Sequence, residues 1–378
     1  MKIAYFLGTL KKEDGVTRVL LALIREAQAR GNETIIITGL AEEDEKTLVV
    51  PIITVPAMVF PLYKEYKLPY PGMRGFARKL DEFRPDIIHV HSPDTLAWAA
   101  VKYAKKRNIP IVATYHTDFA RYLKYYHLSF LRPFIWLIFR RLYNKMRLVS
   151  TPSKSVSAEL ESRGIKNVHT IPWGVDTAKF NPSFRSSEWR RNIISKENNS
   201  GREKSIILYA GRITWEKELR SLAATYNLLR ESRSDFEMVL AGDGPARREL
   251  ETLMPGAIFL GHLEGESLSE AFASSDIFLF PSATETFGNV SLEALASGLV
   301  PILADAGGSR GLVISGENGL LAAAGKSADF YSKVCLLLDN KKMQSELQIN
   351  ALKSAKNYTW QKVEEKFNEL YVEIIRGL

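Results

Sequence analysis

Cysteine is almost absent from this chain of 378 residues: Cys335 is the only one, so no disulfide can form within the chain. Long apolar runs are absent as well. The uninterrupted ones are short, such as Pro133–Phe139, whereas a membrane-spanning helix needs about 20 apolar residues. Residues 1–8 are too short for an export signal and are followed by Lys11 and Lys12, so we expect a first buried strand there. These absences favour a chain that works in the reducing cytoplasm.

Acidic residues are absent between Phe119 and Ala158, although the chain has 43 of them against 51 basic residues. The stretch carries eight basic residues: Arg121, Lys124, Arg132, Arg140, Arg141, Lys145, Arg147 and Lys154. Nine aromatic residues are interleaved with them between Phe119 and Tyr143. The formal net charge of +8 is therefore concentrated in one basic aromatic patch.

Short β-rich runs alternate with helical patterns over the whole chain, which is typical of α/β proteins with parallel sheets. In the first half we expect strands at 3–7, 34–38, 86–91, 111–115, 148–151 and 168–171. A second series follows at 206–210, 237–241, 258–260, 277–280 and 300–304. The runs are almost continuously apolar, as in strands covered on both faces. Since the length exceeds one hydrophobic core, the sequence predicts two doubly wound parallel sheets.

The predicted organisation is a first domain at 1–172, an interdomain segment at 173–204, and a second domain at 205–357. The interdomain segment includes the polar run SKENNSGREK and, from residue 181 onward, lacks both helical and strand periodicity. Near the end of the chain, Val363, Phe367 and Tyr371 are spaced along one apolar helix face. We expect this helix, at 358–378, to dock back on the first domain.

The segment Ser282–Gly298 has the most informative functional pattern: it follows an apolar strand and contains a turn ending at Gly288 and a helical pattern. Such a turn favours anion binding, because unpaired backbone N–H groups and the positive end of the helix dipole point outward. Glu285 lies in the turn and Glu293 in the helix. Their carboxylates could hold the hydroxyls of a hexose and a ribose, or they could be two solvated glutamates.

Two earlier predicted strands end in comparable turns. Arg212 and Lys217 follow one, and Gly242 and Gly244 follow the other. Open α/β sheets bind ligands at the carboxyl ends of their strands. Arginine plus lysine suits a diphosphate, and glycine lets the backbone approach a ligand closely. The three strand ends together predict a nucleotide-sugar site.

Several motifs, taken in order, resemble glycosyltransferase family 4, whose members are retaining enzymes of the GT-B fold. They are GRITWEK from Gly211, GDGP from Gly242, and the pair Glu285 and Glu293. WGVD from Trp173 resembles the interdomain segment of the family, and HVHSPD and YHTD resemble its first-domain signatures. The resemblance extends over nearly the whole chain. It implies two Rossmann-like domains that face a central cleft.

The resemblance also implies roles for individual residues. Arg212 and Lys217 would hold the donor diphosphate, Glu285 the transferred sugar and Glu293 the ribose, while His116 would lie near the reacting carbon. The other implied or candidate donor-binding positions are Gly15, Val16, Gly211, Gly242, Gly244, His262, Leu263, Phe287, Gly288, Asn289 and Val290. The chain departs from many family members at Glu218, where they have glycine, and at the single Gly15, where they have two.

The mechanism implied by the resemblance is transfer with retention at the anomeric carbon and without a divalent metal. Arg212 and Lys217 would offset the charge that develops on the leaving diphosphate. The sequence has no DxD motif and no metal-ligand spacing, so we expect neither metal nor cofactor. From its position alone, His116 could also be a hydrogen-bonded structural histidine. His89 and His91 alternate in a predicted strand, and we expect one to pack and the other to approach the site.

The basic aromatic patch fits an element that lies in the lipid headgroup layer. Within the family it looks most like the glycolipid-forming branch, which includes sulfolipid synthase and bacterial diacylglycerol and mannosyl lipid glycosyltransferases. The candidate acceptor or membrane residues are Asp118, Arg121, Lys124, Trp136, Arg140 and Arg141. We expect an enzyme on the cytoplasmic membrane face that glycosylates a lipid. A core helix with a solvated basic edge is the alternative. A nucleic-acid surface is disfavoured, because the donor motifs would have no role there.

Other functions stay open at this point. A UDP-hexose is favoured as donor over GDP-mannose, and the acceptor could instead be a soluble sugar or a polysaccharide. A binding protein without turnover is a further alternative. A nicotinamide-dependent dehydrogenase is disfavoured, because no GxGxxG follows the first predicted strand. The linkage and the oligomeric state are not addressed by the sequence.

Overall fold

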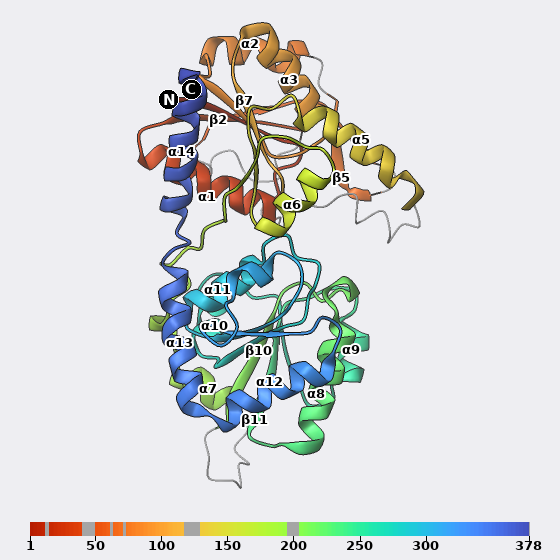
Figure 1. Cartoon of the computed structure of the whole chain (residues 1–378), viewed down its shortest axis with the longest axis vertical. Coiled ribbons are helices and arrows are strands. Elements are labelled where there is room, and N and C mark those ends of the chain that lie inside the picture. The colour runs from red at the N-terminus through yellow and green to blue at the C-terminus, as the bar shows by residue number, and fades with distance from the viewer. Residues whose placement is uncertain are drawn as a thin grey trace. The chain divides into compact units, whose positions relative to one another are not determined.

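The computed structural model describes residues 1–11, 15–39, 50–60, 63–70, 73–116, 129–194 and 204–377. Contacts divide the chain into two compact units, of which unit 1 comprises Met1–Pro172 with Trp360–Leu378, and unit 2 comprises Trp173–Thr359. Each unit contains a parallel β-sheet with helices packed around it (Figure 1). The prediction of two Rossmann-like α/β domains is confirmed.

The sheet of unit 1 has seven parallel strands in the order β3-β2-β1-β6-β7-β8-β9. They are β1 (Lys2–Leu7), β2 (Glu33–Thr38), β3 (Ile52–Thr54), β6 (Ile87–Val90), β7 (Ile111–Thr114), β8 (Val149–Thr151) and β9 (Val168–Thr170). Strands β4 (Ala57–Phe60) and β5 (Tyr63–Pro69) form a separate antiparallel pair. The six strands predicted for this half are present. The pattern missed β3, β4 and β5, because prolines interrupt the apolar runs there.

The helices of unit 1 are α1 (Gly15–Ala29), α2 (Met73–Phe83), α3 (Thr95–Arg107), α5 (Arg132–Tyr143), α6 (Lys154–Ser162) and α14 (Trp360–Arg376), with a 3₁₀ turn η1 (Ser129–Leu131). Local signals delimit α3: the Asp94 carboxylate accepts from the backbone N–H groups of Leu96 and Ala97, and Asn108 ends the helix in the left-handed conformation. None of the described helices is both long enough and apolar enough to cross a lipid bilayer.

Helix α14 packs against α1 although the two are far apart in sequence (Figure 1). Its residues Val363, Phe367 and Tyr371 are buried, as their helical spacing predicted. An ion pair between Arg30, which directly follows α1, and the buried Glu364 of α14 adds a polar contact. The C-terminal helix is thus part of the core of unit 1.

The sheet of unit 2 has six parallel strands in the order β12-β11-β10-β13-β14-β15. They are β10 (Ser205–Ala210), β11 (Phe236–Ala241), β12 (Ile258–Gly261), β13 (Ile277–Phe280), β14 (Val300–Ala304) and β15 (Leu320–Ala322). The helices are α7 (Ser187–Ile193), α8 (Leu219–Ser232), α9 (Arg247–Leu253), α10 (Gly265–Ala273), α11 (Asn289–Ala296), α12 (Ser327–Asp339) and α13 (Lys341–Ala355). The 3₁₀ turns are η2 (Pro182–Phe184), η3 (Trp215–Lys217) and η4 (Ser309–Leu312). The five predicted strands are present, and the short β15 was missed.

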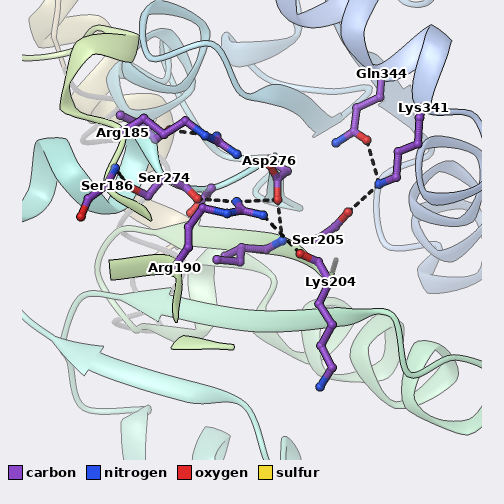
Figure 2. Close-up of polar contacts among 12 residues, drawn as sticks. Arg185, Ser186, Arg190, Lys204, Ser205, Ser274, Asp276, Lys341 and Gln344 are labelled. Carbon is purple, nitrogen blue, oxygen red and sulfur yellow. Dashed lines mark hydrogen bonds and ion pairs between the residues drawn. The ribbon is translucent and has the colours of Figure 1, made fainter. Parts of the chain in front are cut away.

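The strands of unit 2 begin at an edge, here called the amino edge, where charged side chains pair with one another (Figure 2). Arg190 of α7 is 7% exposed and donates to Oδ2 of Asp276 at 2.9 Å. The backbone N–H of Ile206 donates to the same oxygen at 2.8 Å, and Arg185 donates to Oδ1 at 3.2 Å. This cluster ties η2 and α7, in a stretch predicted to lack regular structure, to the beginnings of β10 and β13.

Candidate active site

The strands of unit 2 end at the opposite edge of the sheet, here called the carboxyl edge. Because β12, β11, β10, β13 and β14 are neighbours and run parallel, their last residues lie in one row. The turns after these strands carry most of the predicted site residues: His262 and Leu263 after β12, Gly242 and Gly244 after β11, Gly211, Arg212 and Lys217 after β10, and Glu285 after β13. The edge therefore collects groups that are far apart in sequence.

Lys217 and Glu285 form the central contact of the carboxyl edge. Lys217 Nζ lies 2.6 Å from Glu285 Oε1, although the two residues are 68 positions apart. The two side chains are 22% and 16% exposed, so the pair is largely but not fully shielded from water. A further contact joins the same turns, since the hydroxyl of Thr284 donates to the carbonyl oxygen of Glu216.

The carboxylate of Glu285 is held on one side only. The buried hydroxyl of Ser282 donates to Oε1 at 3.0 Å, the same oxygen that faces Lys217. The backbone carbonyl of Glu285 accepts from Gly308 N at 2.6 Å, which fixes the turn itself. Among the described residues, the hydrogen bonds to this carboxylate come from Lys217 and Ser282, and both go to Oε1 rather than Oε2. Sequence reasoning missed Ser282, although it lies two residues after the end of β13 and precedes Glu285 by three residues.

Arg212 contributes a second positive charge at this edge. Its side chain is exposed and makes no ion pair with any residue in the described part of the chain. Its carbonyl oxygen accepts from the hydroxyl of the fully buried Tyr209 at 3.0 Å. Burial raises the pKa of Tyr209 well above its ordinary value, and the charges of Glu285 and Glu216 raise it further. Tyr209 is thus a neutral donor that holds the Arg212 backbone.

The glycines of the GDGP motif are required by the packing of neighbouring turns. Gly242 has φ +144°, and a Cβ there would lie 2.0 Å from the carbonyl oxygen of Gly211. A Cβ on Gly244 would lie 2.4 Å from the carbonyl oxygen of Ile213, whose N–H donates to the Asp243 carbonyl at 2.9 Å. The sequence analysis explained these glycines by the close approach of a ligand. The structure adds a reason that needs no ligand: two backbone turns touch.

Helix α11 begins beside Glu285 with a glycine cap. Gly288 has φ +91° and makes no side-chain cap, so the first N–H groups of the helix have no partner from a capping side chain. A Cβ on Gly288 would lie 2.7 Å from Cβ of Ser309, and one on Gly308 would lie 1.8 Å from the Thr286 carbonyl oxygen. This tight backbone can accept an anion at the helix N-terminus. Asn289 and Val290 form the first turn, and Glu293 lies one turn further on.

The remaining candidates in unit 2 differ in exposure. Phe287 is 2% exposed, and the centroid of its ring lies 5.5 Å from that of Trp173. Its side chain is therefore part of the core and does not form a ligand-facing surface. His262 is exposed, and its Nε2 lies 3.1 Å from Oε1 of Glu264. Leu263 is half-buried. Any contact of His262 with a ligand would therefore compete with Glu264.

In unit 1, His116 directly follows the turn after β7 and is 5% exposed. Its Nε2 lies 2.8 Å from Nδ1 of His91. Burial lowers the pKa of His116 to about 3, so the imidazole is neutral at physiological pH. Burial also lowers the pKa values of His89 and His91. Both are buried. His89 packs, as expected of one of the two, and the Tyr371 hydroxyl lies 2.7 Å from its Nδ1, whereas His91 contacts the candidate site residue His116.

The other candidates in unit 1 lie in α1 and α5 or outside the described residues. Gly15 and Val16 open α1. Asp118, Arg121 and Lys124 lie outside the described residues. Arg140 and Arg141 are exposed on α5, as expected of a basic surface. Trp136 corrects the sequence analysis: it is 5% exposed and packs in the core, so its ring is not an exposed interface aromatic. Among the described residues of this region, the exposed rings are those of Phe130 and Phe134.

In the part of the chain that the structure describes, no three His, Cys, Asp or Glu side chains come together in a group that could hold a metal ion. Cys335, the only thiol, lies half-buried on α12.

Comparisons with known proteins match both halves of the chain to glycosyltransferases. A family described as Glycosyltransferase Family 4 matches residues 14–179, and one described as Glycosyl transferases group 1 matches residues 204–340. The second match includes Arg212, Lys217, Glu285 and Glu293. The two matches together span most of the chain.

Three curated relatives extend this similarity. The chain is 34% identical to the sulfoquinovosyl transferase SQD2 of Arabidopsis thaliana, over 92% of this chain and 68% of that protein. It is 32% identical to a GDP-mannose-dependent alpha-mannosyltransferase of Corynebacterium glutamicum, over 97% and 87%. It is 27% identical to an alpha-monoglucosyldiacylglycerol synthase of Streptococcus pneumoniae, over 80% and 71%.

A solved structure agrees on the fold. The Anabaena protein HepE in complex with UDP matches with a TM-score of 0.80 and 18% sequence identity, over 99% of this chain and 100% of that one. At this identity the match supports the fold, which is that of the GT-B glycosyltransferases.

Proposed function

Because the chain belongs to glycosyltransferase family 4, we propose that it moves a hexose from a nucleotide diphosphate sugar to a hydroxyl of a membrane lipid, with retention at the anomeric carbon. The single observation that carries the proposal is the contact of Lys217 with Glu285 at the carboxyl edge, with the exposed Arg212 beside it in the same row of turns. A cation pair suits a diphosphate, and a carboxylate with one unused oxygen suits sugar hydroxyls.

The donor would lie along the carboxyl edge of unit 2. Arg212 and Lys217 would bind the diphosphate, and the N–H groups at the start of α11 would add neutral donors to its oxygens. Oε2 of Glu285 would accept from hydroxyls of the transferred hexose, because Oε1 is already engaged with Ser282 and Lys217. Glu293, one turn into α11, would bind the ribose.

During transfer, negative charge grows on the leaving diphosphate. Two cations already in place stabilise that charge without reorganisation, which is the usual origin of large electrostatic rate effects. We expect no divalent metal to be needed, because Arg212 and Lys217 supply positive charge at the same place. Transfer rates measured with EDTA and with added Mg²⁺ or Mn²⁺ should agree, and a strict dependence on either metal would contradict this expectation.

His116 would act as a neutral group near the reacting carbon. Its pKa of about 3 means that it carries no charge at pH 7 and cannot repel an oxocarbenium-like centre. The contact between its Nε2 and His91 Nδ1 holds the ring orientation. A neutral imidazole can then form a hydrogen bond with the substrate, or the dipole of its ring can stabilise the substrate.

For the donor base, we propose uridine first and guanosine second. The Corynebacterium relative named for GDP-mannose supports guanosine, and the UDP complex of the structural neighbour is in keeping with uridine. Calorimetric titration of the purified protein with UDP and with GDP separates the two. If GDP binds more tightly than UDP, we expect GDP-mannose rather than a UDP-hexose as the donor.

For the acceptor, a lipid is supported by two observations. The Streptococcus relative is named an alpha-monoglucosyldiacylglycerol synthase, and α5 carries exposed Arg140 and Arg141 as well as the exposed ring of Phe134. Such a surface can associate reversibly with an anionic membrane. The enzyme would then be peripheral on the cytoplasmic membrane face.

The test uses radiolabelled UDP-glucose or GDP-mannose with vesicles that contain diacylglycerol. Label should move into the organic phase with wild type and stay in the aqueous phase with Glu285→Gln. If wild type labels only soluble sugars or a polysaccharide, the lipid acceptor is wrong while the transferase chemistry stands. If donor is bound but never turned over with any acceptor class, the catalytic proposal itself fails.

A further inference from the structure

Unit 1 has a pocket of about 410 Å³ that shares no residue with the carboxyl edge of unit 2. Three arginines and three apolar side chains line it: Arg132, Arg140, Arg163, Pro133, Trp136 and Leu137. We call it the arginine pocket. Helix α5 supplies all of these residues except Arg163, which directly follows α6. Sequence analysis singled out Arg140 and Trp136, but not Arg163, which lies outside the basic aromatic patch.

Helical spacing and aromatic packing define the pocket. Arg132, Trp136 and Arg140 are four residues apart, so they lie along one face of α5. The guanidinium carbon of Arg163 lies 5.2 Å from the centre of the Trp136 ring, within cation–π distance. Since Trp136 is packed in the core of unit 1, it holds Arg163 against a rigid wall.

Gly164 allows the two chain segments to approach each other. It has φ +78°, which favours glycine, and a Cβ there would lie 3.1 Å from Cδ of Arg140. Any larger residue would push against the Arg140 side chain. The proximity of Arg140 to the end of α6 thus depends on a backbone position that only glycine occupies without strain.

The positive charge of the pocket is not neutralised within the described part of the chain. Arg140 and Arg163 form no ion pair with a described residue. Arg132 has one distant carboxylate, since its Nη2 lies 4.0 Å from Oε1 of Glu159. Two buried donors that belong to lining residues, Nε of Arg132 and Nε1 of Trp136, also have no hydrogen-bond partner among the described residues. Guanidinium groups gathered in this way repel one another, and a bound anion relieves the repulsion.

We propose that the arginine pocket binds a phosphate group that carries an organic substituent. Guanidinium groups match phosphate oxygens in a bidentate manner, and three of them can address different oxygens of one tetrahedral group. The volume lies in the range of small-molecule sites, about 300–1,000 Å³, and exceeds what a bare phosphate needs. Pro133 and Leu137 offer apolar contacts to the substituent. The phosphate can belong to a soluble phosphoester or to the headgroup of an anionic phospholipid.

The test compares variants of Arg163 with a matched control in the full-length protein. Arg163→Gln removes one lining charge, whereas Lys166→Gln removes one charge three residues away that is exposed, as Arg163 is, but does not line the pocket. Arg163→Lys keeps the positive charge but loses the planar guanidinium group that can make bidentate contacts. Both residues lie outside the basic aromatic patch, so the comparison is independent of the general charge of α5.

Two probes distinguish the sources of the phosphate. Glycerol 3-phosphate is titrated by calorimetry, and sedimentation measures binding to phosphatidylcholine vesicles with and without phosphatidylglycerol. We expect Arg163→Gln to weaken binding roughly tenfold and Arg163→Lys severalfold, because a charge-assisted bidentate contact is lost. Lys166→Gln should stay within about twofold of wild type, because it is an exposed charge outside the pocket.

Each outcome is decisive. If Arg163→Gln and Lys166→Gln weaken probe binding equally, or if Arg163→Lys binds the probes as wild type does, the surface is diffusely basic and the proposed binding pocket is wrong. If the Arg163 variants lose binding to glycerol 3-phosphate alone, the ligand is a soluble phosphoester. If they lose binding to phosphatidylglycerol vesicles, the ligand is a lipid headgroup. Glu285→Gln should bind both probes as wild type does, so a failure of the proposed donor site leaves this result interpretable by itself.

Discussion

The two edges of the sheet in unit 2 each contain a cation paired with a carboxylate, but they use the pair differently. At the amino edge, the side chains of Arg190 and Asp276, taken without their backbone, are 9% and 11% exposed, and both oxygens of Asp276 accept hydrogen bonds (Figure 2). At the carboxyl edge, Lys217 and Glu285 are 22% and 16% exposed, and only Oε1 of Glu285 is used by described residues. The first arrangement is complete by itself, while the second has capacity for a ligand.

Within this one sheet, the amino edge therefore contributes to stability, and the carboxyl edge is the candidate ligand-binding edge. A carboxylate whose acceptor capacity is filled by its own chain contributes to folding, because removing its charge leaves a shielded arginine without an anionic partner. A carboxylate with a free oxygen, beside an exposed cation such as Arg212, can change partners when a substrate arrives. Changes at the two edges should therefore affect different measurements.

The largest effect is expected at the carboxyl edge. Glu285→Gln should lower kcat by about a hundredfold to a thousandfold, because the amide neither pairs with Lys217 as an anion nor accepts from sugar hydroxyls as strongly. Its thermal unfolding midpoint should stay close to that of wild type. The rate of transfer to lipid and a thermal melt of the same preparation check both parts. Turnover near that of wild type would show that Glu285 has no such role.

The reverse outcome is expected at the amino edge. Asp276→Asn should lower the free energy of unfolding by about 3 kcal/mol, since Arg190 would stay shielded without its anion. The control is Asp339→Asn, which breaks an ion pair with Arg233 at a side chain that is 63% exposed, and should cost less than about 1 kcal/mol. Denaturant unfolding measures both. Equal costs would mean that the Asp276 cluster is no more important than a surface pair.

A smaller effect is expected for the exposed cation at the carboxyl edge. Arg212→Ala should lower kcat/KM for the donor roughly tenfold through loss of one charge-assisted contact, with little change in stability. Arg212→Lys should restore part of the loss, because it returns the charge but not the fork. Steady-state kinetics at varied donor concentration give both values. If kcat/KM of Arg212→Ala equals that of wild type, Arg212 is not part of the donor site.

The smallest effect concerns pH and the buried histidines of unit 1. The pKa of His116 is lowered from 6.5 to about 3 in the folded state, so the unfolded chain binds its proton first as pH falls. The stabilising contribution of the neutral, folded form is present above pH 6.5 and is lost progressively as pH falls toward 3. At pH 5.5 this loss is about 1 kcal/mol for one histidine. Unfolding of wild type and His116→Gln between pH 7.5 and 5.5 should show a shallower dependence in the variant. Parallel curves would mean that His116 does not titrate differently in the two states.

The sequence analysis was most successful where a local pattern carries the information. Continuous apolar runs predicted the six main strands of unit 1 and the five of unit 2 that are longer than three residues. It missed β15, a strand of three residues of which Leu320 and Ala322 are buried, although β8 and β9 are equally short and were predicted. It also failed for Trp136, whose burial depends on packing against residues from elsewhere in the chain.

The candidate site shows the same division. The identities of Arg212, Lys217 and Glu285 were available from their motifs and from their positions after strands. The role of Ser282 beside Glu285 was not, and neither was the packing reason for Gly242, since a glycine in a turn looks the same whether it faces a ligand or a neighbouring backbone.

The amino-acid sequence by itself determined the alternation of strands and helices, the order of the motifs and the family, because each depends on residues close together in the chain. Only the tertiary structure decided that Lys217 meets Glu285, that both oxygens of Asp276 are filled, and that Arg163 joins two arginines of α5 around a pocket. These contacts join residues far apart in the chain. Their geometry is set by the packing of parallel strands and of the helices between them, which no local pattern records.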